Sequence, residues 1–219
     1  MDTIIGLLII APPILFALTV HEYAHGWMAL RFGDPTARDA GRLTLNPLSH
    51  LDPIGTLMLF IVHLGWAKPV PVNPYNLRYP KKDMMWVSLA GPGANLLTAF
   101  ACGLIIRLIN PLSGNFDMGT SAFGILVMMI VYGMVINLVL AFFNLIPLPP
   151  LDGSKILMGL LPAEYEYQML QLERIGPFLL IGIIVIGSLA NVPILWMILH
   201  PFVSFFSFLF AGVDFSSFF

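Results

Sequence analysis

His21-Glu22-Tyr23-Ala24-His25 lies inside the apolar stretch from Thr3 to Ala29, and this motif in this setting decides how the chain is interpreted. Residues four apart share a helix face, so His21 and His25 can bind one zinc ion from consecutive turns. Glu22 lies about 100° around the helix from His21, where it can act as a base instead of a third ligand. Such side chains are costly in hydrocarbon, so their presence in a span indicates a function.

The composition is that of a membrane protein. Of the 219 residues, 58% are hydrophobic and only 10% are charged, whereas soluble domains carry about 25% charged residues. We therefore predict an all-α polytopic membrane protein with a single integral membrane domain over residues 1–219. The net charge of −2 gives no indication of nucleic-acid binding, and the single cysteine, Cys102, excludes an intrachain disulfide.

Five stretches meet or approach the roughly 20 apolar residues that a transmembrane helix needs. We expect a core that carries the motif at about residues 3–155 and two C-terminal helices at about residues 175–211. The region around Glu164–Arg174 is predicted to be a solvated surface helix. The five predicted spans are Thr3 to Ala29, Met85 to Ile109, Ala122 to Leu145, Ile175 to Ala190 and Pro193 to Ala211.

A sixth apolar run, Ile54 to Trp66, is too short to span, and charge decides its topology. If the run dips in and returns, nine of the ten Lys and Arg residues fall on one side, with Arg107 as the exception. A full crossing would split them four to six. The positive-inside rule favours a re-entrant or membrane-associated segment at about residues 54–74, with the N-terminus outside. The proline-rich stretch from Ala67 to Pro74 predicts extended or β-like chain at the membrane surface.

The same topology predicts a third metal ligand. A catalytic zinc ion typically keeps three protein ligands. The first span exits to the cytoplasm near Leu30 and the third span ends on that side, so Asp152 emerges close to the histidines. Had the sixth run crossed, Asp152 would lie on the opposite side. The alternative is that Asp152-Gly153 after the prolines is an ordinary surface turn.

Three motifs follow one another in the chain: His21 through Gly26, Gly91-Pro92-Gly93-Ala94-Asn95, and Asn144 through Gly153. Together they resemble the site-2 protease family of intramembrane zinc metalloproteases, peptidase family M50, in its compact form without PDZ or CBS domains. The resemblance covers about Leu18 to Lys155. It implies one Zn²⁺ per chain, a three-helix catalytic core, the zinc ligands His21, His25 and Asp152, and Glu22 as catalytic base.

The resemblance also implies a function. We expect an intramembrane zinc metalloendopeptidase that hydrolyses peptide bonds in or near transmembrane segments of membrane proteins. It would be a multi-pass protein of the cell membrane, with its site toward the cytoplasmic side. The Asn144 amide is expected to help stabilise the oxyanion. Asn95 is expected either to bind substrate or to take part in helix packing through small neighbours.

Two other functions use the same residues. A membrane transporter for divalent cations or protons could employ the His/Glu/Asp cluster, although transporters more often place ligands at the bilayer midplane. A scaffold that binds membrane helices without cutting them would have no need for Glu22. His50 and His63 are expected to be satisfied interfacial histidines, with an approach to the site as the alternative.

Overall fold

The chain is all-helical in this computed structural model, which describes residues 3–55, 67–109 and 121–212. In those ranges no β-sheet forms, and Leu51 and Ala67 make an isolated antiparallel bridge. Five helices are long and apolar enough to cross a membrane, which confirms the predicted fold class. They are α1 (Thr3–Arg31), α4 (Pro80–Ile109), α5 (Ala122–Asn144), α7 (Glu166–Leu189) and α8 (Ile194–Ala211).

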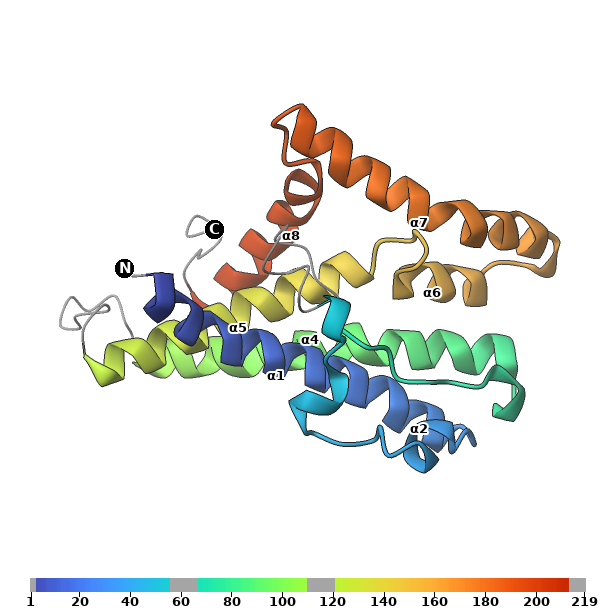
Figure 1. The fold of residues 1–219 in the computed structure, drawn as a ribbon, viewed down its shortest axis with the longest axis horizontal. Helices are drawn as coiled ribbons and strands as arrows, with labels where there is room; N and C mark the ends of the chain where they lie inside the picture. Colours follow the sequence, from blue (N-terminus) through green and yellow to red (C-terminus); the bar gives the residue numbers. More distant parts are fainter. Residues whose placement is uncertain (1–2, 56–66, 110–120, 213–219) are drawn as a thin grey trace.

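Helix α4 is the centre of the bundle. It packs against α1, α5, α8 and the short helix α6 (Asp152–Leu160), and α1 also packs against α5. Both α1 and α5 run antiparallel to α4 (Figure 1), which gives the three-helix core that the family resemblance implies. The buried apolar cluster joins α4 and α5 to α8, and its members are Ala99, Ile106, Met134, Val135, Leu138, Val203 and Ala211.

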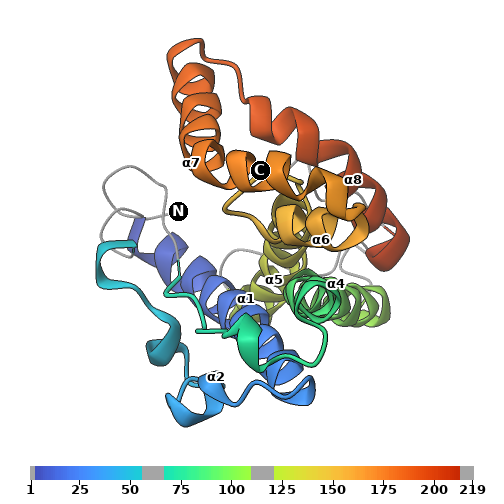
Figure 2. The same cartoon turned by 90° about the vertical axis from the view of Figure 1, so that its right-hand side faces the viewer.

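The outermost helix differs from its prediction. Helix α7 begins at Glu166, so the predicted surface helix and the predicted fourth span are one continuous element. Its polar first turns extend the span beyond the apolar stretch that starts at Ile175. Two views show that α7 slants away from α1 and α4 and lies beside α6 and α8 (Figures 1 and 2).

The segment between α1 and α4 starts and ends at the same end of the bundle. Helix α1 is closed by Gly33, whose φ of 107° is readily adopted only by glycine. An added Cβ on Gly33 would lie 3.2 Å from the Asn76 carbonyl oxygen, so residues 33 and 76 are neighbours. This arrangement is what a re-entrant segment requires, although most of the run from Ile54 to Trp66 lies outside the described residues.

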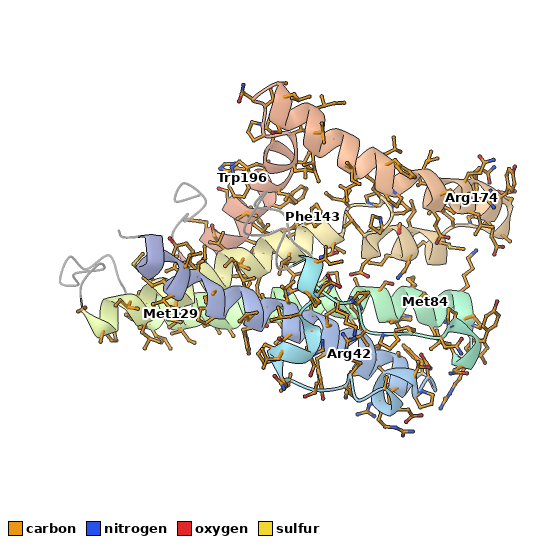
Figure 3. All side chains as sticks on the ribbon, viewed as in Figure 1. Arg42, Met84, Met129, Phe143, Arg174 and Trp196 are labelled. Atoms are coloured by element: carbon orange, nitrogen blue, oxygen red, sulfur yellow. The ribbon has the colours of Figure 1, made fainter. Side chains whose placement is uncertain are left out.

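Charged side chains follow this polarity. Arg42 and Arg174 lie toward the end of the bundle where α1 and α5 terminate, and Met129 lies toward the other end (Figure 3). Arg107, the exception in the charge count, belongs to the last turn of α4 and donates from Nη2 to the Leu209 carbonyl oxygen at 2.7 Å. It thereby satisfies one of the terminal carbonyls of α8.

Replacing Gly103 with alanine should loosen the contact between α4 and α8. The added Cβ would lie 2.5 Å from Phe210 Cβ and 2.9 Å from its carbonyl carbon, and backbone atoms cannot retreat cheaply. Overpacking of this kind costs about 1–3 kcal/mol. Thermal unfolding in detergent should show a lower midpoint for Gly103→Ala than for Gly182→Ala, whose Cβ would meet nothing within 4 Å. Equal midpoints would contradict the predicted clash.

Candidate metal centre

The two histidines of α1 meet an aspartate from α6. His21 Nε2 and His25 Nε2 each lie 3.2 Å from Asp152 Oδ2, and the two nitrogens are 3.0 Å apart. Zinc binds imidazole nitrogen and carboxylate oxygen at about 2.0–2.2 Å, and tetrahedral ligand atoms then lie roughly 3.3 Å from one another. The spacing of these three atoms therefore fits a zinc ion, and a ligand set of this kind suits zinc chemically.

The other ring nitrogen of each histidine, Nδ1, already has a hydrogen-bond partner. His25 Nδ1 lies 2.7 Å from the Val87 carbonyl oxygen. A carbonyl only accepts hydrogen bonds, so Nδ1 carries the proton and Nε2 of the neutral ring keeps a free lone pair. His21 Nδ1 lies 2.6 Å from Asn95 Oδ1. Each ring therefore presents Nε2 to the shared point, which is how partners behind a ligand fix its tautomer and orientation.

The direction of the His21 bond is set by a chain of buried amides. Asn95 Nδ2 donates to the Ala17 carbonyl oxygen at 3.0 Å and to Asn137 Oδ1 at 2.7 Å. Asn137 Nδ2 in turn donates to the Gly133 carbonyl oxygen at 2.7 Å. Both amide groups thus have only one orientation that satisfies their partners, and Asn95 Oδ1 must accept from His21. This chain links α1, α4 and α5 behind the first ligand.

Asp152 is presented by the irregular turn that joins α5 to α6. The chain leaves α5 at Asn144, passes a cis peptide bond at Pro149-Pro150, and makes Asp152 the first residue of α6. Gly153 permits a close approach, because an added Cβ would lie 2.4 Å from the carbonyl oxygens of residues 145 and 146.

Gly91 of α4 lies directly against the imidazole rings of His21 and His25. A Cβ on Gly91 would lie 2.4 Å from His25 Nε2 and 2.7 Å from His21 Cε1. Any side chain there would occupy the space that the imidazole rings use. The absence of a side chain at this position is therefore part of the fit of the site to a metal ion.

Glu22 lies beside His21, His25 and Asp152 but is not part of the cluster that could hold a metal ion. Its Oε2 accepts a hydrogen bond of 2.7 Å from the backbone amide of Val70, in the extended chain before α4. A cavity of about 340 Å³ opens at this point and is lined by thirteen residues. They are His21, Glu22, His25, Pro69, Val70, Val72, Met84, Val87, Ser88, Asn144, Pro150, Asp152 and Lys155.

Asn144 and Asn95, which were both expected at the site, occupy different positions relative to the cavity. Asn144 lines the cavity and donates from Nδ2 to the Leu140 carbonyl oxygen at 3.0 Å. Asn95 is fully buried behind His21 and does not line the cavity. His50 is also buried, with Nε2 2.8 Å from the Thr44 carbonyl oxygen, and does not line it either. His63 lies outside the described residues.

Several contributors were not identified from the sequence. The Val87 carbonyl and the Val70 amide are backbone groups, so their residue types do not predict their roles in the site. Asn137 belongs to α5 and contributes through its hydrogen bond with Asn95 of α4. Gly91 appeared in the Gly-Pro motif, but its contact with the histidines depends on how α4 packs against α1.

Comparison with known proteins gives one consistent result. The sequence profile described as peptidase family M50 matches residues 9–186. The chain is 38% identical over 188 residues to a Bacillus subtilis protein named "Putative zinc metalloprotease YwhC", covering 83% of each chain. It is 33% identical to "Putative zinc metalloprotease Rip2" of Mycolicibacterium smegmatis, covering 81% of this chain and 66% of that protein. No solved structure matches at a significant level.

Proposed function

This chain belongs to peptidase family M50, the site-2 protease family of zinc metalloproteases, and on that basis we propose that it cleaves transmembrane segments of other membrane proteins. It is a multi-pass membrane protein, with five helices of spanning length and composition. The observation that carries the proposal is the meeting of His21, His25 and Asp152 beside Glu22 in a chain with five helices that could span a membrane.

In this proposal His21, His25 and Asp152 hold one zinc ion. Their three ligand atoms lie 3.0–3.2 Å apart, and the ring partners keep both lone pairs directed at the same point. Three acceptor atoms at this spacing repel one another unless a cation lies between them. Zinc supplies a lowered pKa for bound water and polarises a peptide carbonyl.

Glu22 acts as the base in this assignment. It takes a proton from the attacking water and delivers it to the leaving amine. The Val70 amide fixes Oε2 of Glu22 at 2.7 Å, which leaves Oε1 for the proton. Asn144 lines the same cavity, and since an amide nitrogen carries two hydrogens, one can stay on Leu140 while the other donates to the developing oxyanion. Asn95 is assigned to holding His21.

The substrate is proposed to be a transmembrane helix that unwinds locally. A peptide bond inside a helix is shielded by its neighbours and its hydrogen bonds, so the chain must open before it can reach the cavity. Because the site is carried by membrane-spanning helices, the substrate helix is proposed to approach laterally, within the plane of the bilayer. Nine of the ten Lys and Arg residues belong to segments at the end of the bundle that carries the site, which supports a site on the cytoplasmic side and an N-terminus outside.

A transporter is the less favoured function. His21 and His25 lie near one end of α1, ten and six residues before its last residue, Arg31. A transporter would more often place its ligands at the bilayer midplane on several broken helices. Family membership and the names of the relatives point to proteolysis.

Removal of the metal tests the proposal directly. The purified protein in detergent should cleave a reporter span of about 20 apolar residues with a central helix break. A zinc chelator should abolish cleavage as zinc content falls, and added Zn²⁺ should restore both. The matched control is a reporter with the same span and no helix break, which should be cleaved more slowly. Cleavage that persists after all zinc is removed would exclude the assignment.

A further inference from the structure

Asp34 is a fully buried carboxylate in the loop directly after α1. Its Oδ2 accepts from the Asn73 amide at 2.7 Å, and its Oδ1 accepts from Asn76 Nδ2 at 2.8 Å. The amide and the hydroxyl of Thr36 also donate to Oδ1. The Asp34 amide itself donates to the Ala29 carbonyl oxygen at 2.9 Å, so the residue is tied to the frame of α1.

Two partners of Asp34, Asn73 and Asn76, belong to residues 67–76, an extended segment that ends in the 3₁₀ turn Pro74–Asn76 and that we call the strap. Prolines at positions 69, 71 and 74 lack an amide hydrogen, so the strap cannot pair as a regular strand. It is held instead at separate points. The Lys68 amide donates to the His50 carbonyl oxygen at 2.9 Å, and the Lys68 carbonyl accepts from Arg42 Nη2 at 2.8 Å.

After Lys68, the strap contacts Glu22, the proposed base. The Val70 amide donates to Glu22, and the Val70 side chain lies against α1 at Gly26, where an added Cβ would be 3.1 Å from Val70 Cγ1. Asn73 follows three residues later and is bound by Asp34. The contacts close a ring: Glu22 and Asp34 are fixed to one another by α1, and Val70 and Asn73 by the strap.

We infer that Asp34 is a positioning residue for Glu22, because it fixes the strap at the height where the Val70 amide meets the Glu22 carboxylate. The inference rests on the proposed role of Glu22 as base. Glu22 belongs to a helix, whereas its hydrogen-bond donor belongs to the strap, which is held at Lys68 on one side of Val70 and by Asp34 on the other. Without Asp34 the strap keeps Lys68 and the packing of Val70 on Gly26, but it loses the hydrogen bonds at Asn73 and Asn76 that fix its other end to α1.

The chemistry of the site requires a carboxylate there. Burial alone would raise the pKa of Asp34, but hydrogen bonds from Thr36, Asn76 and Asn73 lower it, so the group is a charged acceptor. An asparagine would turn one oxygen into an NH₂ group that faces N–H donors. Either the Asn73 amide or the Asn76 side chain would then lose its acceptor.

The Asp34→Asn variant tests this inference, with Asp39→Asn as its matched control. Asp39 lies in the same region but is exposed, and it pairs with Arg38. Hydrogen–deuterium exchange of residues 67–76 should become about tenfold faster in Asp34→Asn, whereas exchange in α1 and bound zinc should not change. With the broken-helix reporter span, kcat should fall about tenfold and KM should stay within about twofold. Asp39→Asn should match the wild type in every measurement.

Two results would overturn the inference: unchanged exchange in the strap, or a loss of kcat that only parallels a loss of zinc. If Asp34→Asn fails to fold, Asn76→Ala removes one of the same hydrogen bonds and should shift exchange and kcat in the same direction by a smaller factor. A reporter that the wild type does not cleave would count against the proposed function. The exchange measurement would still decide whether Asp34 anchors the strap.

Discussion

Replacement of Glu22 by glutamine is expected to abolish cleavage while zinc content and thermal stability stay at wild-type values. The two side chains have the same shape, and the glutamine oxygen can still accept from the Val70 amide. An amide cannot take up a proton at neutral pH, so the transfer from water to the leaving amine is lost. General acid–base catalysis contributes about 10²–10⁴ to a rate, and the loss should be at least of that size.

The experiment needs three readouts from one preparation. Zinc stoichiometry, thermal unfolding in detergent and cleavage of the reporter span should be measured for Glu22→Gln beside Glu173→Gln. Glu173 is exposed on α7, away from the cavity, and makes a matched control for the change in charge. Cleavage by Glu22→Gln at the wild-type rate would remove Glu22 from the mechanism. Loss of zinc in the same variant would assign it to the metal ligands instead.

Replacement of Gly91 by alanine is expected to expel the metal without unfolding the protein. The added Cβ would stand 2.4 Å from His25 Nε2 and 2.6 Å from His25 Cε1, far inside contact distance. The rings cannot move back, because His25 is bound to the Val87 carbonyl and His21 to Asn95. Disturbing partners behind metal ligands typically costs 10–100-fold in metal affinity, and a direct clash with a ligand atom should exceed that range.

Gly93→Ala is the control for this prediction. It lies on the same helix two residues later, and its Cβ would meet nothing within 4 Å. Both changes favour the helix by up to about 1 kcal/mol, so a general loss of helix stability cannot explain a difference between them. Zinc titration should show weakened binding and little cleavage for Gly91→Ala and normal binding for Gly93→Ala. Equal zinc affinity in the two variants would show that the rings tolerate the added carbon.

The meeting of His21, His25 and Asp152 was predictable because local geometry and membrane topology limit where these side chains can be. His21 and His25 share a helix face at a spacing of four residues. Asp152 followed from the charge count, since only one topology puts it at the depth of the histidines, and the structure brings these three side chains together. Both ends of α5 and α8 and the last residue of α4 were predicted to within one residue, because apolar length is a strong signal in a membrane protein, whereas α4 begins at Pro80, before the predicted Met85.

The environment of the ligands could not be predicted in the same way. Asn95 was indicated as a candidate for substrate binding or packing, and only the rotation of α4 about its axis turns it toward His21 and away from the cavity. The start of α7 was misplaced for a related reason. A polar helical extension has no apolar signal, and its continuity with the span depends on backbone hydrogen bonds that any sequence can make.

The sequence by itself determined a membrane protein of five spans, a histidine pair with an adjacent glutamate, and an aspartate expected at the same depth as the histidines. Periodicity, apolar length and charge follow from the order of the residues, so they can be recognised without a three-dimensional structure. Only the tertiary structure decided that Gly91 leaves room for the imidazole rings, that Val70 holds Glu22, and that Asp34 reaches across to Asn73. Those contacts join residues from 39 to 70 positions apart, and two of them use backbone groups, so their partners are set by how the helices and the strap pack.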